Sequence, residues 1–146
     1  DSADLLPRII DEFGDKTFGL VYFDPNGIKL NSNATVFDVA RSICLNPKFR
    51  YIDILIRFSG TNYKRIRKAF PDKYPDLRTQ LKTVNKKKWI CRKISYDEHG
   101  YRDPFQWTFL LGTNWTDYKA WKKEGFYDID DPESNFQIIN RTLDEV

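Results

Sequence analysis

Two short apolar runs constrain the fold of this chain more than any other feature of its sequence. They span residues 18–23 (Phe-Gly-Leu-Val-Tyr-Phe) and 51–58 (Tyr-Ile-Asp-Ile-Leu-Ile-Arg-Phe). The first run is continuous and ends at Asp24-Pro25, which predicts a short strand that is buried on both faces, as in a parallel sheet. Because parallel strands need a long crossover between them, we expect a helix in the intervening segment.

Helical spacing of apolar residues supports this alternation. It predicts a helix over 5–13 that stops at Gly14, and a second over 35–44 with Thr35 as its N-cap. Further helices are expected between Ser59-Gly60-Thr61-Asn62 and Pro71, over 76–83 and over 115–126. Two extended runs, 89–96 and 105–111, flank the charged loop 97–104 and predict an antiparallel pair. The expected fold is one α/β domain over 1–146, with a Rossmann-like, mostly parallel sheet and a C-terminal antiparallel hairpin.

The composition excludes several classes of protein. No apolar run among the 146 residues approaches the roughly 18 residues that a membrane span needs, so we expect no membrane partner and a cytoplasmic protein. Two cysteines and one histidine do not form a metal site, and Cys44 and Cys91 are predicted to be small core residues. The cluster of Asp97, Glu98 and His99 fits a solvated turn better than a metal or acid–base site. The sequence has no methionine, so we expect a cleaved or trimmed protein, or part of a longer polypeptide.

Positive charge gathers in one stretch of the sequence. Residues 64–93 contain 12 Lys and Arg residues against two Asp, and aromatic residues lie between the charges. Such a segment can contact phosphates and stack on bases, but lysines also commonly solvate an exposed helix face, and both readings stay open. The candidate nucleic-acid-binding residues are Lys64, Arg65, Arg67, Lys68, Lys86, Lys87, Lys88, Arg92 and Lys93.

Asp24, Pro25, Asn26 and Gly27 follow the first predicted strand. In an open α/β sheet, ligands bind at the carboxyl ends of the strands, where the Asp24 carboxylate and a neighbouring carbonyl could accept hydrogen bonds from an amine. The same four residue types also favour successive positions of a type I β-turn. The spacing alone therefore favours a turn over a catalytic site.

The Asp-Pro-x-Gly turn, the strand at 51–56 and the aromatic segment from Phe105 to Trp121 together resemble a known family. They are similar to the second half of class I S-adenosylmethionine-dependent methyltransferases, and more closely to the three-Cys-motif partner proteins of bacteria and phages. The resemblance implies a partial methyltransferase-like domain that transfers a methyl group to an amine, such as one on nucleic acid. It implies that Asp24, Pro25 and Asn26, with Gly27, orient the amine, and that Asp1 faces the adenine of S-adenosylmethionine.

The chain departs from the family pattern in two ways. Gly27 stands where an aromatic ring would stack on the target base, so Tyr22, Tyr63 or Tyr101 would have to supply that ring. The chain also lacks a glycine-rich cofactor loop. We therefore expect S-adenosylmethionine to bind only together with the N-terminal portion of the same protein or a second chain. The alternative is a non-enzymatic module that binds nucleic acid, or assembles, in a phage-related or defence complex.

Overall fold

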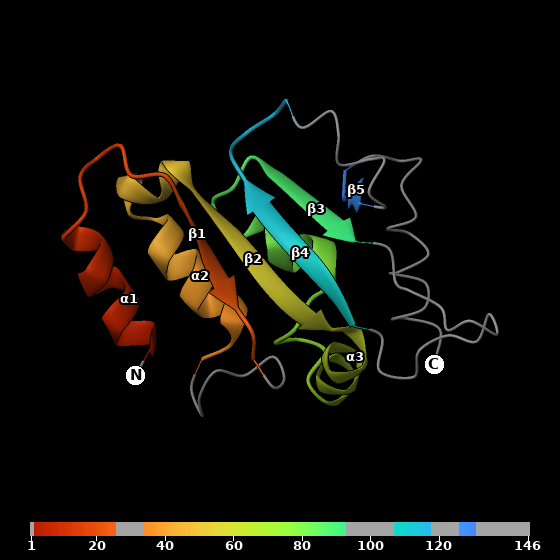
Figure 1. Ribbon diagram of the computed structural model, residues 1–146. Helices are drawn as coiled ribbons and strands as arrows, with labels where there is room; N and C mark the ends of the chain where they lie inside the picture. The colour runs from red at the N-terminus through yellow and green to blue at the C-terminus, as the bar shows by residue number, and fades with distance from the viewer. Residues whose placement is uncertain (1, 26–33, 93–106, 118–125, 131–146) are drawn as a thin grey trace.

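Helices and strands alternate along the first half of the chain (Figure 1). The computed structural model describes residues 2–25, 34–92, 107–117 and 126–130, so Asp1, Asn26, Gly27, Lys93, Tyr101 and the 97–99 cluster lie outside the described residues. The helices are α1 (Ser2–Asp11), α2 (Val36–Cys44), the 3-10 helix η1 (Pro47–Tyr51), α3 (Gly60–Ala69) and α4 (Leu77–Lys82). The strands are β1 (Gly19–Phe23), β2 (Ile52–Ser59), β3 (Lys88–Arg92), β4 (Trp107–Thr113) and β5 (Phe126–Asp128).

The strands form one five-stranded mixed sheet in the order β1-β2-β4-β3-β5. Strands β1 and β2 are parallel, and Val21 lies opposite Ile54. Strand β4 is antiparallel to both of its neighbours, β2 and β3, and β5 is antiparallel to β3. Because β4 is reversed relative to both neighbours, β3 runs in the same direction as β1 and β2. We call the end where β1 and β2 finish the carboxyl edge, and the end where they begin the amino edge.

This topology corrects part of the expected fold. The α/β class and the antiparallel β3–β4 pair are confirmed. The expectation of a mostly parallel sheet is wrong, since one of the four neighbouring pairs is parallel. The hairpin does not form the margin of the sheet, because β4 lies in its interior and β5 follows β3. Hydrophobic periodicity identifies a strand but carries no information on its neighbours, which explains the error.

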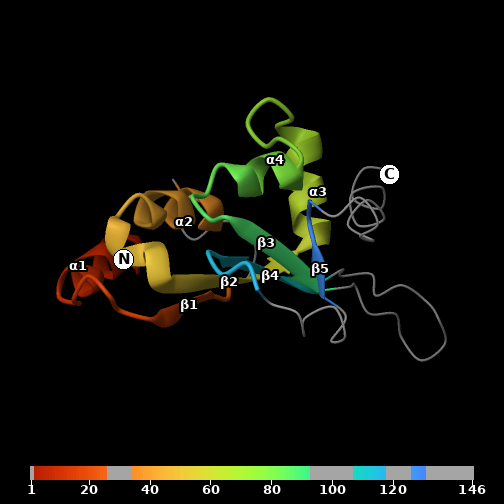
Figure 2. The same ribbon diagram turned by 90° about the horizontal axis from the view of Figure 1, so that it is seen from above.

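All of the described helices that cover the sheet lie on one of its faces (Figure 2). On that side, alternate residues of β2 and β4 point into the core, where Ile54, Ile56 and Leu110 are fully buried. An aromatic group closes the core between α2, β2 and α3. Its Phe58 and Tyr63 rings lie 5.4 Å apart, and the Tyr63 hydroxyl donates a hydrogen bond to the Pro75 carbonyl at 2.6 Å.

The opposite face of the sheet, which we call the open face, carries no described helix (Figures 1 and 2). Its side chains on β1, β2 and β4 include Leu20, Tyr22, Leu55, Arg57, Trp107, Phe109 and Leu111, which alternate with the core residues of the same strands. Leu20 and Tyr22 are 57% and 49% exposed, so the expectation that β1 is buried on both faces is wrong. One layer of helices buries one face of a sheet, and the other face is accessible at β1, whereas Ile90 of β3, opposite Leu111, is buried.

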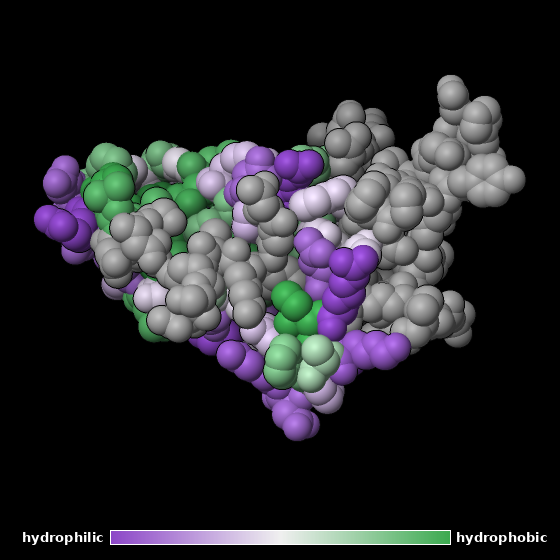
Figure 3. All heavy atoms as spheres, turned by 90° about the horizontal axis from the view of Figure 1, so that it is seen from below, coloured by the Kyte–Doolittle hydropathy of each residue, from purple (hydrophilic) through white to green (hydrophobic). Residues whose placement is uncertain are grey.

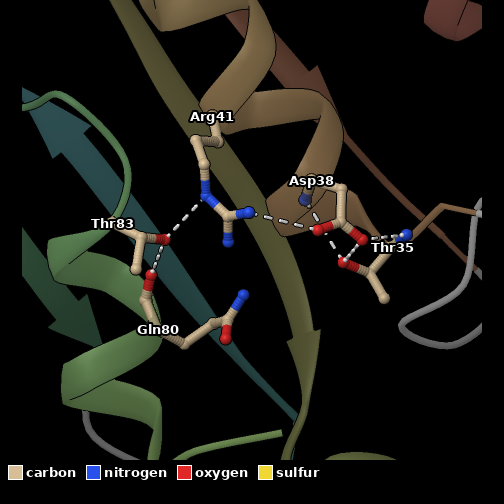
Figure 4. A network of polar contacts seen from close by, with 5 residues as sticks. All are labelled: Thr35, Asp38, Arg41, Gln80 and Thr83. Carbon is tan, nitrogen blue, oxygen red and sulfur yellow. Dashed lines mark hydrogen bonds and ion pairs between the residues drawn. The ribbon is translucent and has the colours of Figure 1, made fainter. Parts of the chain in front are cut away.

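Local capping sets the ends of α2 and α4. Thr35 caps α2 as expected, and Asp38 completes a capping box by accepting from the Thr35 backbone at 2.9 Å. Arg41 pairs with Asp38 and also donates to the Thr83 hydroxyl of α4's C-cap at 3.1 Å (Figure 4). The hydrogen bond from Arg41 to Thr83 therefore connects α2 to the end of α4, two helices that cover the same face of the sheet. Phe126 lies in β5 and not in a closing helix, which corrects that end of the expected 115–126 helix.

Candidate functional site

A carboxylate, a guanidinium and aromatic rings lie near one another at the carboxyl edge, on the open face. Arg57 of β2 donates to Asp24 Oδ1 at 3.1 Å, and its guanidinium lies over the Trp107 ring of β4 at 4.4 Å from the centroid. Tyr22 projects from the same face of β1, two residues before Asp24. We call Tyr22, Asp24, Arg57 and Trp107 the edge cluster.

Strand register explains why these residues meet. Tyr22 lies on the open face of β1, and Asp24 follows directly after the end of that strand, two residues further on. Arg57 lies opposite Phe109 on β4 and therefore next to Trp107 on the same face. The Arg57 and Asp24 side chains are 42% and 45% exposed, so their ion pair contributes little to stability but holds the guanidinium plane in place. A partly exposed cation and ring of this kind offer a surface on which a planar group can stack.

The sequence pointed to part of this cluster and missed the rest. Asp24 was predicted, and Tyr22 was one of three rings considered as a replacement for the ring missing at Gly27. Tyr63, the second, is 1% exposed in the core, and burial raises its pKa, so it is not available for stacking. Arg57 and Trp107 were missed. Their signal was the period-two pattern of β2 and β4, which places both on the face opposite the core.

Pro25 is buried beside this cluster. The fixed backbone of a proline at this position orders the end of β1, as the sequence implied. The turn predicted over 24–27 is not tested, because Asn26 and Gly27 lie outside the described residues.

The basic segment divides between the two ends of the sheet. Arg65 and Lys68 are exposed on α3 and Arg67 is half-buried there, and α3 begins directly after β2 at the carboxyl edge. Figure 3 views this edge from below and shows hydrophilic residues around a smaller hydrophobic group where α3 lies. Lys64 and Arg92 belong to α3 and β3, but their side chains are not described.

The second basic group lies at the amino edge, where β3 begins. The Lys86 ammonium donates to the carbonyls of Phe49 and Ile52 at 2.7 and 2.5 Å, and its pKa is lowered by burial. Lys88 pairs with Asp128 at 3.1 Å, and both side chains are largely buried. Of these three lysines, only Lys87 is exposed. The three lysines therefore do not form one continuous charged surface with α3.

The described residues at the carboxyl edge do not fit S-adenosylmethionine as a complete site. Asp1 and Gly27 lie outside the described residues, and Gly14 and Gly19 lie before and within β1, not in a loop between a strand and the next helix. Within the described ranges, no three His, Cys, Asp or Glu side chains group in a way that could hold a metal ion. No described helix has both the length and the apolar character required to cross a membrane.

Comparison with known proteins adds nothing to this geometry. No family model, no curated protein and no solved structure matches the chain.

Proposed function

We propose that this chain is the acceptor-binding half of a class I methyltransferase-like domain, and that its carboxyl edge receives an amine-bearing base of a nucleic acid. The observation that carries the proposal is the edge cluster, in which the Arg57 guanidinium contacts both the Asp24 carboxylate and the Trp107 ring where β1 and β2 end, with Tyr22 exposed on the same face. Ligands of open α/β sheets bind at this end of the strands.

The strand arrangement supports the methyltransferase part of the proposal. A reversed strand between two strands of common direction resembles the C-terminal part of the class I methyltransferase sheet, and here β4 lies reversed between β2 and β3. In that fold a second layer of helices covers the other face of the sheet. The open face, with its exposed Leu20 and Tyr22, is where such a layer would pack.

The chemistry of the edge cluster suits an exocyclic amine. Arg57 donates to Asp24 Oδ1, and a carboxylate carries a second oxygen that can accept a hydrogen bond from the amine. Trp107 and Tyr22 supply the aromatic surface that is missing at Gly27. S-adenosylmethionine would supply the methyl group, and we propose that the N-terminal portion of the same protein or a second chain holds it.

Stacking by Trp107 is the first test. We expect Trp107→Ala to weaken binding of a single-stranded oligonucleotide about tenfold, measured by fluorescence anisotropy, because base–aromatic stacking is worth about 1–3 kcal/mol per base. Phe13→Ala is the matched control, since Phe13 is 44% exposed in the segment between α1 and β1, outside the edge cluster. Equal affinities for the two variants, with unchanged circular dichroism, would remove the base-stacking role.

Cofactor binding is a separate test. Calorimetric titration of S-adenosylmethionine into the complete polypeptide encoded by the gene should give saturable binding. If no heat of binding is measured while oligonucleotide binding persists, the methyltransferase part of the proposal fails and the nucleic-acid part stands.

The second candidate is a non-enzymatic nucleic-acid-binding or assembly module of a phage-related or defence complex. The observation that favours it is α3, which has no acidic residue in its first turn and exposes Arg65 and Lys68 at the carboxyl edge. Replacing both with Glu should weaken oligonucleotide binding and make it less dependent on salt, by a slope of about one for each lost phosphate contact. An unchanged salt slope would exclude α3 from the interface.

A further inference from the structure

A cavity of about 480 Å³ opens at the amino edge, at the end of the sheet opposite the edge cluster. Its walls come from the end of α2, the 3-10 helix η1, the segment before β3 and the segment that follows β4. This volume lies within the range of about 300–1,000 Å³ that small-molecule sites occupy. The cavity shares no residue with the edge cluster, so it is independent of the proposed acceptor site.

One side-chain amide fixes the rim of this cavity. Asn114 accepts a hydrogen bond from the Lys87 backbone at 2.9 Å and donates one to the Arg50 carbonyl at 2.9 Å. Asn46 is likewise engaged, because its oxygen accepts from the Lys48 backbone at 3.0 Å. Arg50 and Lys87, which lie far apart in the sequence, are therefore held on one rim through their main chains.

The charge of the cavity wall has one sign. Arg50 and Lys87 are both exposed, and no Asp or Glu lines the cavity. Neither cation forms an ion pair within the part of the chain that the structure describes. The ammonium of Lys86 lies behind the wall, where it is bound to carbonyls of the adjacent backbone and its charge is opposed by the nearby Asp53 carboxylate. An anion is the complementary ligand for such a wall.

The remaining wall is apolar and aromatic. Trp115 is 53% exposed although it lines the cavity, and the Tyr51 ring contacts the Phe18 ring at 5.1 Å and the Arg50 guanidinium at 5.6 Å. Burial raises the pKa of the Cys44 thiol to about 11, so this wall residue stays protonated and offers no nucleophile. The cavity therefore presents aromatic rings next to two cations, and none of these wall residues offers a nucleophile.

We propose that the cavity binds a planar aromatic ligand that carries an anionic group, with the chemistry of a nucleoside 5′-monophosphate. The ring system stacks on Trp115, and the phosphate receives hydrogen bonds from Arg50 and Lys87 next to the Tyr51 ring. Charge-assisted contacts to phosphate are among the stronger hydrogen bonds in proteins, and aromatic stacking adds tolerance for different bases.

The test is calorimetric titration of AMP into the 146-residue chain, with adenosine and inorganic phosphate as partial ligands. We expect saturable binding of AMP and at least tenfold weaker binding of each partial ligand. Arg50→Gln and Lys87→Gln should each weaken AMP binding about tenfold, because each substitution removes a charge-assisted hydrogen bond. Lys73→Gln is the matched control, since this exposed lysine lies over Tyr74, away from the cavity.

Trp115→Phe and Trp115→Ala separate stacking from charge. The Phe variant should retain most of the AMP affinity and the Ala variant should lose about tenfold. A parallel titration with a 5′-phosphorylated oligonucleotide distinguishes a free nucleotide from the end of a nucleic-acid strand as the ligand. If the ligand is a strand end, the oligonucleotide should bind at least as tightly as AMP. Absence of saturable AMP binding at millimolar concentration overturns the proposal, as does AMP affinity that Arg50→Gln and Lys87→Gln leave unchanged.

Discussion

Gly112 provides the sharpest test of the packing described above. It lies on β4 between Ile54 of β2 and Trp89 of β3, on the core side of the sheet. A Cβ atom added at Gly112 would lie 2.7, 2.8 and 2.9 Å from three carbons of the Trp89 ring. Ordinary contact begins at 3.4 Å, so the ring would have to retreat by about 0.7 Å. Trp89 is 3% exposed inside a packed core and has little room to do so.

We therefore expect Gly112→Ala to lower the free energy of unfolding by about 1–3 kcal/mol, the usual cost of overpacking a core. For a chain of this size, each kcal/mol corresponds to a fall in Tm of roughly 2–4 °C. Urea and thermal unfolding, followed by circular dichroism, measure both quantities. Gly19→Ala is the matched control, because a Cβ atom at Gly19 in β1 meets nothing within 4 Å.

A double-mutant cycle with Trp89→Phe identifies the clash itself. Phenylalanine lacks the three ring carbons that the added Cβ would meet, and the Trp89 indole nitrogen has no hydrogen-bond partner among the described residues. The double variant should lose less stability than the sum of the single variants, by more than about 0.5 kcal/mol. Additive losses, or a Gly112→Ala variant as stable as Gly19→Ala, would refute the close approach of the ring to β4.

Three further results are expected. Asp76 caps α4, so Asp76→Ala should lower the free energy of unfolding by about 0.5–2 kcal/mol. Burial acts to raise the pKa of Asp76, but hydrogen bonds from Thr79 and the charge of Arg67 lower this pKa overall. The ionised Asp76 carboxylate stabilises the fold at pH values above its unfolded pKa of 3.8, and this stabilisation is lost as the pH falls below that value. Urea titrations should therefore show that acid destabilises Asp76→Asn less than it destabilises the parent. Cys44 and Cys91, with pKa values raised by burial to about 11 and 12, should react with a thiol reagent at pH 8 only on unfolding, as followed by absorbance.

Local elements of this fold were predictable because their signals lie within a few residues of one another. Thr35 and the apolar stripe after it mark α2, and Ser59 and Pro71 bracket α3. These signals act through capping hydrogen bonds and backbone restriction, which depend on neighbouring residues alone. The helix bounds that they predict agree with the structure to within a few residues.

The candidate sites depend on contacts between distant parts of the sequence and were predictable only in part. Asp24 could be named from its turn, but its partner Arg57 lies 33 residues away. Asn114 bonds to the Arg50 carbonyl across 64 residues, and no local pattern marks an asparagine for that role. Charge counts also misled at Lys86, because a long side chain can turn inward when backbone carbonyls are available as acceptors.

The position of β4 has a consequence for how the chain is made. Gly112 pairs with Ile54, so 58 residues (112 − 54) separate partners that lie side by side in the finished sheet. During synthesis on the ribosome, β2 emerges when β1 is the one partner strand already made. Its partner β4 begins only after a further 48 residues, from Ser59 to Trp107, have been added, and this synthesis takes roughly 2–10 s at the usual rates. During that interval the unpaired side of β2 is accessible to other nascent chains or to chaperones. Slower translation between β3 and β4 should therefore lengthen this exposure and lower the soluble yield.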